Sequence, residues 1–130
     1  MRYAYAELLD DDAEIARPVL DVVVEGMAEA PIRCLVDSGS CNTLLPAWSA
    51  ELAGVSLTSA ERRALGTGGL TVEAAFATTR LTLGEHSWEA EVGFCERWPY
   101  GFGLLGQTSF FRFFVVTMRA ADWELEVEPA

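Results

Sequence analysis

The sequence has few basic residues, few cysteines and a single histidine. Lys and Arg together number 9 against 20 Asp and Glu, which gives a formal net charge of −11 in 130 residues. This excess of carboxylates argues against binding to nucleic acid phosphates or to anionic lipid. We therefore expect partners that are neutral or basic, and no nucleic acid among them.

Long apolar runs are also missing. Asp10, Asp11 and Asp12 fall where a secretory signal would need an apolar stretch, and no later segment has the ~18 uninterrupted apolar residues of a membrane span. We therefore expect a soluble, cytoplasmic protein with no membrane partner. The chain length suits one domain over residues 1–130, and a hydrophobic fraction of 51% is enough for a core.

The cysteines and the histidine form no metal-binding pattern. Cys34, Cys41 and Cys95 are an odd number of cysteines without C-x-x-C spacing. Cys34 lies in an apolar run, where a free cysteine acts as a small hydrophobic residue, and a lone histidine such as His86 is typical of a surface turn. Nothing in the sequence activates a cysteine for a nucleophilic pair with His86. We expect no metal and no cofactor.

Short segments with a period of two, divided by turn residues, favour an all-β domain. They predict strands at 17–26, 31–37, 42–46, 103–106 and 123–127, and a buried strand at 114–118. Helix is predicted over 47–54, after Pro46 and up to Gly54, and for about one turn over 107–113. Thr58-x-x-Glu61 is a capping-box pattern, which leaves 57–65 open between a helical turn and a loop.

Residues 71–94 are expected to form a long hairpin or two hairpins, with a turn at 84–85. In the first half, Val72, Ala74 and Phe76 share one face, whereas Leu81 and Leu83 have the other parity. We interpret this change of parity as a bend or bulge near residues 78–79.

One carboxylate, Asp37, ends the apolar run "CLV" and is followed by Ser38 and Gly39. An Asp-Ser-Gly triplet is also common turn chemistry, so the triplet alone leaves a structural role open. An acid mounted on a buried strand and followed by a tight turn would, however, be rigid and within reach of backbone N–H groups.

Three separated segments resemble the retropepsin-like aspartic proteases, the retroviral-type, single-domain family, and occur in the family's order. "LVDSGS" at 35–40 is similar to the catalytic D-[ST]-G-[AS] signature, and "LGTGGLTVEA" at 65–74 is similar to the glycine-tipped flap. "GLLGQTSFF" at 103–111 is similar to the Gly-containing segment and short helix that follow. The resemblance implies an all-β, closed acid-protease barrel with one or two short helices and one lobe per chain.

The resemblance also implies a homodimer that cleaves a peptide or protein substrate, because the chain carries only one such triplet and each subunit would give one catalytic Asp. Residues 3–8 and 124–128 are the expected interface strands. The catalytic group implied is Asp37, Ser38 and Gly39. The flap and pocket residues implied for substrate binding are Gly66, Thr67, Gly68, Gly69, Leu70, Val72, Leu104, Leu105 and Gly106.

Some positions depart from the family pattern. Ser38 stands where Thr is common, and Gln107 stands where Arg is frequent, which would remove a supporting ion pair. An aspartic endopeptidase is the favoured function. Two alternatives remain: a peptide-binding module of the same fold with little or no turnover, and an unrelated small β-barrel in which Asp37 caps a turn and "GTGG" is a surface hairpin.

Overall fold

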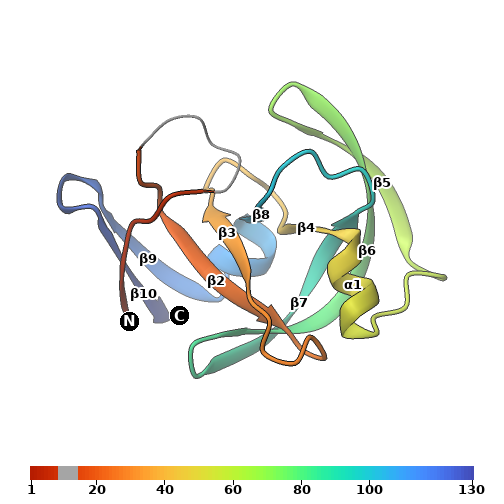
Figure 1. The fold of residues 1–130 in the computed structure, drawn as a ribbon, viewed down its shortest axis with the longest axis horizontal. Helices are drawn as coiled ribbons and strands as arrows, with labels where there is room; N and C mark the ends of the chain where they lie inside the picture. Colours follow the sequence, from red (N-terminus) through yellow and green to blue (C-terminus); the bar gives the residue numbers. More distant parts are fainter. Residues whose placement is uncertain (9–14) are drawn as a thin grey trace.

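The computed structural model describes residues 1–8 and 15–130, and most of its elements are β-strands (Figure 1). Asp10, Asp11 and Asp12, used above to argue against a secretory signal, lie outside the described residues. The helical elements are α1 (Ala47–Ala53), the π-helical turn η1 (Gln107–Phe111) and the 3₁₀ turn η2 (Ala120–Asp122). The strands are β1 (Arg2–Ala4), β2 (Val19–Val24), β3 (Ile32–Val36), β4 (Leu44–Pro46), β5 (Glu61–Thr67), β6 (Leu70–Leu83), β7 (His86–Cys95), β8 (Gly103–Leu105), β9 (Phe114–Arg119) and β10 (Glu124–Pro129).

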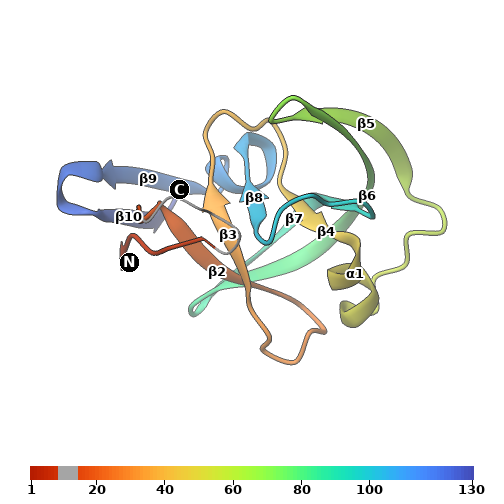
Figure 2. The ribbon, with the colours of Figure 1, turned by 45° about the horizontal axis from the view of Figure 1, so that its top comes forward.

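The larger sheet closes on itself. Its strand order is β2-β3-β8-β4-β7-β6-β5, and β2 also pairs with β6, so the strands from β2 to β6 form a closed barrel (Figure 2). The hairpin of β5 and the first part of β6 projects beyond this barrel. The predicted all-β closed barrel with short helices is therefore confirmed. None of the helices in the described part of the chain is long and apolar enough to cross a membrane.

The main core is built around aromatic rings from three elements. Trp88 of β7 lies 4.8 Å from Phe114 of β9, and Phe110 of η1 stacks on Phe114 at 5.0 Å between ring centroids. The Trp88 indole N–H donates to the Ser109 carbonyl oxygen at 2.8 Å, which satisfies its polar atom. This packing attaches η1, and the segment before it, firmly to the barrel.

Strand β6 has no bulge, so of the bend or bulge expected near residues 78–79 the bulge is wrong. Its pairing with β7 runs without a break from Ala74↔Cys95 to Leu83↔His86. The buried apolar residues of β6 change from even-numbered to odd-numbered positions because the strand contributes to two cores. Val72 faces a smaller cluster near the hairpin, whereas Leu81 and Leu83 face the main core.

Two further expectations are corrected. Residues 61–67 are neither a helical turn nor a loop, because all of them pair with β6 from Glu61↔Phe76 to Thr67↔Leu70. The segment 114–118 is a strand, but only Phe114 is buried, and the Val115 side chain is 59% exposed. Strand β9 belongs to a sheet that covers the main core with one face and leaves the other face open.

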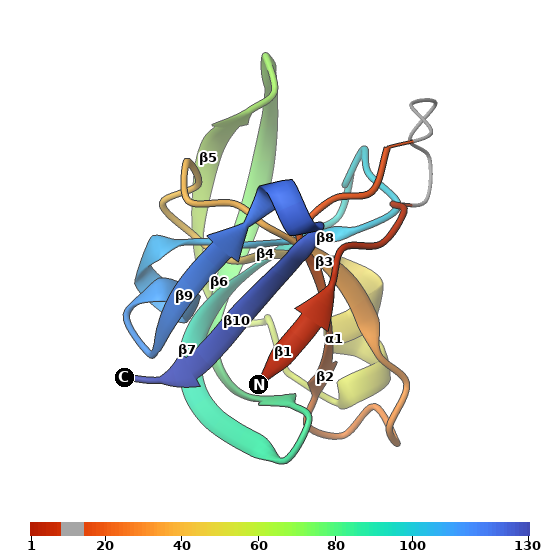
Figure 3. The same cartoon turned by 90° about the vertical axis from the view of Figure 1, so that its left-hand side faces the viewer.

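The chain termini pair with each other in a second sheet of order β1-β10-β9 (Figure 3). Tyr3 pairs with Leu125, and Arg2 pairs with Glu126. The Arg2 guanidinium donates to the Glu126 carboxylate at 2.6 Å, which lowers the pKa of that carboxyl group. The row of glutamates along β10 is thus partly neutralised within the chain.

Replacing Phe110 by Ala should destabilise the fold by about 3–5 kcal/mol, because it removes a fully buried ring and leaves a cavity beside Trp88 and Phe114. The measurement is urea unfolding at fixed protein concentration. Leu52→Ala is the matched control, since Leu52 is 63% exposed on α1 and should change stability by less than about 0.5 kcal/mol. Equal effects of the two substitutions would contradict this assignment of the core.

Candidate active site

Three short strands meet where Asp37 leaves β3. Strand β8 lies between β3 and β4, parallel to β3 with Val36 opposite Leu105 and antiparallel to β4 with Leu44 opposite Leu104 (Figure 2). The loop 37–43 connects the two outer strands around the end of β8. The backbone at Asp37 is therefore held by three neighbouring strands of the barrel wall.

The Asp37 carboxylate is oriented by its own turn. The Gly39 backbone N–H donates to Asp37 Oδ1 at 2.9 Å, and the Ser40 N–H donates to the Asp37 carbonyl oxygen at 3.1 Å. The Asp37 N–H in turn donates to the Leu105 carbonyl oxygen at 3.0 Å. Asp37 is half-buried, whereas Ser38 and Gly39 are exposed. This arrangement presents a rigid carboxylate at the surface of one chain.

The segment after β8 supports this loop through hydrogen bonds. The Gly106 N–H donates to the buried Thr43 hydroxyl at 3.1 Å, and the Gln107 N–H donates to the Ser40 carbonyl oxygen at 2.9 Å. The Gln107 side-chain amide donates to the Ser38 carbonyl oxygen at 2.7 Å. The ion pair expected to be lost at position 107 is thus replaced by a neutral hydrogen bond to the same loop.

Gly106 lies so close to the loop that no side chain fits. A Cβ atom there would be 2.2 Å from the Asn42 carbonyl oxygen and 2.7 Å from the Ser40 carbonyl oxygen. Both contacts are with backbone, which cannot rotate away. The residue permits the close crossing of two chain segments directly behind the Asp37 turn.

The glycine-rich segment forms the tip of the β5–β6 hairpin (Figure 1). Thr67 pairs with Leu70, and the turn between them is made by Gly68 and Gly69, with φ of 54° and 81°. Two successive residues with positive φ are typical of a type I′ turn, for which glycine is well suited. Gly66 lies in β5 outside the left-handed region, so only two of the three glycines use positive φ.

A smaller apolar cluster lies between the base of the hairpin and the strands that carry Asp37. It brings Val72 of the hairpin together with Leu44 and Leu104, and Leu35 packs against it. Leu105, also expected near the substrate, is instead fully buried in the main core. Of the expected pocket residues, Val72 and Leu104 therefore share this cluster.

An aromatic loop, residues 96–102, closes one side of this cluster, and the sequence reasoning missed it. The Tyr100 ring lies 5.2 Å from the Trp98 ring and 5.2 Å from the Phe102 ring, and the Trp98 indole N–H donates to the Phe102 carbonyl oxygen at 2.7 Å. The Tyr100 hydroxyl lies against the hairpin tip, where a Cβ on Gly68 would be only 2.4 Å from it. The aromatic residues at every second position in "WPYGF" were the signal in the sequence that could have indicated this loop.

The three cysteines occupy different environments. Cys34 and Cys95 are buried, and Cys41 is exposed in the loop after Asp37. Burial raises the pKa of the Cys34 thiol above its ordinary range and that of Cys95 to about 11, so both stay protonated at neutral pH. No group of three or more potential metal ligands gathers within residues 1–8 and 15–130.

No known protein-family profile matches this sequence, and no curated protein matches it. Among solved structures, the chain is similar to the crystal structure of a retropepsin-like aspartic protease from Rickettsia conorii. The TM-score is 0.62 at 20% sequence identity, over 96% of this chain and 88% of that chain. This similarity shows that the chain has a retropepsin-like fold, which excludes the unrelated small barrel considered above.

Gly106→Ala should destabilise the protein by about 1–3 kcal/mol, because the new methyl group would overlap the Asn42 carbonyl oxygen. Gly66→Ala is the matched control. Nothing lies within 4 Å of a Cβ at Gly66, so this substitution should be neutral or stabilising by up to about 1 kcal/mol. Urea unfolding of both variants checks the comparison. A Gly106→Ala variant as stable as Gly66→Ala would disprove the close crossing.

Proposed function

We propose that the protein is an aspartic endopeptidase that works as a homodimer, with Asp37 of each subunit in one shared site. The observation that carries this proposal is the Asp37 carboxylate itself, fixed by the Gly39 N–H in a turn at the centre of a retropepsin-like fold. A residue that only capped a turn would not need the hydrogen bonds by which Thr43, Gly106 and Gln107 hold the loop after Asp37.

Two such carboxylates brought together would share one proton, because like charges at close range cannot both ionise. One Asp37 then takes a proton from a water molecule that attacks the peptide carbonyl, and the protonated Asp37 of the second subunit donates to the carbonyl oxygen. The Gly39 N–H keeps one oxygen of each carboxylate in place during both transfers.

The exposed surface of a single chain supports dimerisation. Ser38 and Gly39 are exposed beside Asp37, where a second copy would cover them. The terminal sheet also exposes apolar side chains, namely Val115 and Met118 of β9 and Trp123 at the β9–β10 turn. Covering apolar groups of this kind stabilises a two-fold interface. The site is incomplete without the partner, because one chain supplies one Asp37.

Substrate would bind as an extended strand between the hairpin and Asp37. Main-chain hydrogen bonds to the tip residues Gly66, Thr67, Gly68, Gly69 and Leu70 would supply affinity, and alternate side chains would enter apolar pockets. Val72 and Leu104 form one wall of such a pocket in their shared cluster. Because glycine adopts positive φ without steric cost, Gly68 and Gly69 form the tip without backbone strain.

A peptide-binding module without turnover is the second candidate, and the contact between Tyr100 and Gly68 favours it. The Tyr100 hydroxyl packs against the hairpin tip of the same chain. This packing opposes the movement of the hairpin away from the site that turnover requires. Binding of a peptide by a confirmed dimer that cleaves nothing would favour this candidate over the endopeptidase.

Asp37→Asn should lower peptide cleavage by at least about 10²-fold, because an amide cannot take a proton from water. The assay is cleavage of a diverse peptide pool from acidic to neutral pH, at a concentration where sedimentation shows a dimer. Glu89→Gln is the control, since Glu89 is exposed on β7 and lies outside the Asp37 turn, the hairpin and the terminal sheet. Full cleavage by Asp37→Asn would exclude the proposed mechanism.

A further inference from the structure

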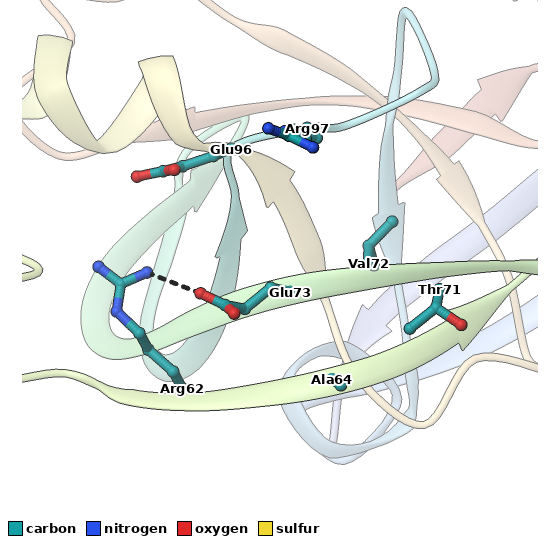
Figure 4. Close-up of a pocket in the computed structure, with 7 residues that line it drawn as sticks. All are labelled: Arg62, Ala64, Thr71, Val72, Glu73, Glu96 and Arg97. Carbon is teal, nitrogen blue, oxygen red and sulfur yellow. Dashed lines mark hydrogen bonds and ion pairs between the residues drawn. The ribbon is translucent and has the colours of Figure 1, made fainter.

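Two surface pockets that share one residue lie beside the candidate active site. The first, which we call the β6-edge pocket, has a volume of about 460 Å³ and is lined by Arg62, Ala64, Thr71, Val72, Glu73, Glu96 and Arg97 (Figure 4). The second, which we call the α1 pocket, has a volume of about 420 Å³ and is lined by Ala47, Trp48, Glu51, Val55, Leu57 and Glu96. Glu96 lines both pockets, so they are neighbours on the surface, and we call the two together the trough.

The β6-edge pocket contains an unpaired strand edge. The pairing of β6 with β7 ends at Ala74↔Cys95, so residues 71–73 pair with β5 alone within the described chain. After Cys95 the chain turns away from β6, and Glu96 and Arg97 lie across the pocket from this edge (Figure 4). An open strand edge presents backbone N–H and C=O groups to which an extended peptide can pair.

The α1 pocket is apolar with an acidic rim. Trp48 is 52% exposed, and Val55 and Leu57 complete the apolar wall. Leu52, one helical turn after Trp48, extends this surface. Both charged side chains that line the pocket, Glu51 and Glu96, are acidic. The pocket thus suits a bulky apolar side chain with a basic side chain next to it.

We propose that this trough binds an extended protein segment by strand addition to residues 71–73 of β6, with an apolar side chain on Trp48 and a neighbouring basic side chain beside Glu51 and Glu96. The strand edge selects the extended conformation, the α1 pocket selects the apolar group, and the acidic rim selects the basic group. In the β6-edge pocket, Arg62 pairs with Glu73 at 3.2 Å, whereas Arg97 forms no ion pair within the described residues and lies across the pocket from Glu73 (Figure 4).

The trough and the smaller apolar cluster share Val72, whereas Leu44, Leu104 and Trp98 of that cluster line neither pocket. The Asp37 turn also lies outside the residues that line the trough. The proposal does not depend on catalysis, so it can be tested in the Asp37→Asn chain.

The test uses the peptide Gly-Thr-Lys-Phe-Lys-Thr-Gly, blocked at both ends, added to the ¹⁵N-labelled Asp37→Asn chain. The indole N–H signal of Trp48 and the backbone amides of residues 71–73 should shift, because they line the trough. The backbone amide of Gly39 should stay in place, since it reports on the Asp37 turn, which lies outside the trough. The same peptide with both lysines replaced by glutamate should bind at least about tenfold more weakly.

Variants check the individual contacts. Trp48→Ala and Glu96→Gln should each weaken binding at least about fivefold. Glu89→Gln is the matched control for charge, because Glu89 is exposed on β7 and lines neither pocket. Both Trp48 and Glu96 are exposed, so neither substitution should prevent folding.

Two results would overturn the proposal: no shift of the Trp48 signal at millimolar peptide, or a shift of the Gly39 amide without one of Trp48, which would mean binding at the Asp37 turn. Binding that Glu96→Gln leaves unchanged would contradict the acidic rim. The outcome is separate from that of the cleavage assay. A shifted Trp48 signal in a protein that cleaves no peptide would support the proposal of a binding trough and contradict the proposal of an endopeptidase.

Discussion

The close crossing behind Asp37 is the constraint on which the rest of the site depends. Gly106 lets the end of β8 approach the backbone of residues 40–42, and the Thr43 hydroxyl and the Gln107 amide then hold the loop from within the chain. Within the described residues, the contacts that stabilise the Asp37 turn are all hydrogen bonds from neutral groups.

The hairpin and the aromatic loop lie next to this rigid base. Val72 of the hairpin and Leu104 of β8 meet in one apolar cluster, and the Tyr100 hydroxyl lies against the hairpin tip at Gly68. Each chain therefore carries one oriented carboxylate, one glycine-tipped hairpin and one apolar cluster between them. The terminal sheet, with its exposed apolar side chains, offers the surface through which two such halves could combine.

The local features of this fold could be predicted from the sequence, whereas features that depend on distant pairing could not. The strand before Asp37 and the turn at Gly68 and Gly69 follow from apolar alternation and glycine chemistry, which act within a few residues. Residues 61–67 contain Glu, Arg, Ala and Leu, which favour helix in isolation, and only pairing with β6 makes them a strand. The parity change in β6 resulted from two cores on opposite faces, and the contact of Tyr100 with Gly68 depends on a loop conformation that no period reveals.

The central claim, that two chains share one site, is tested most directly by subunit mixing. Wild-type and Asp37→Asn chains are combined in equal amounts, allowed to exchange, and assayed for peptide cleavage at a total concentration that maintains the dimer. If every active dimer needs Asp37 from both chains, activity should fall to about a quarter of that of the same concentration of wild type, because random pairing leaves only that share of intact dimers. A fall to about one half would contradict the account, because each wild-type chain would then be working independently of its partner.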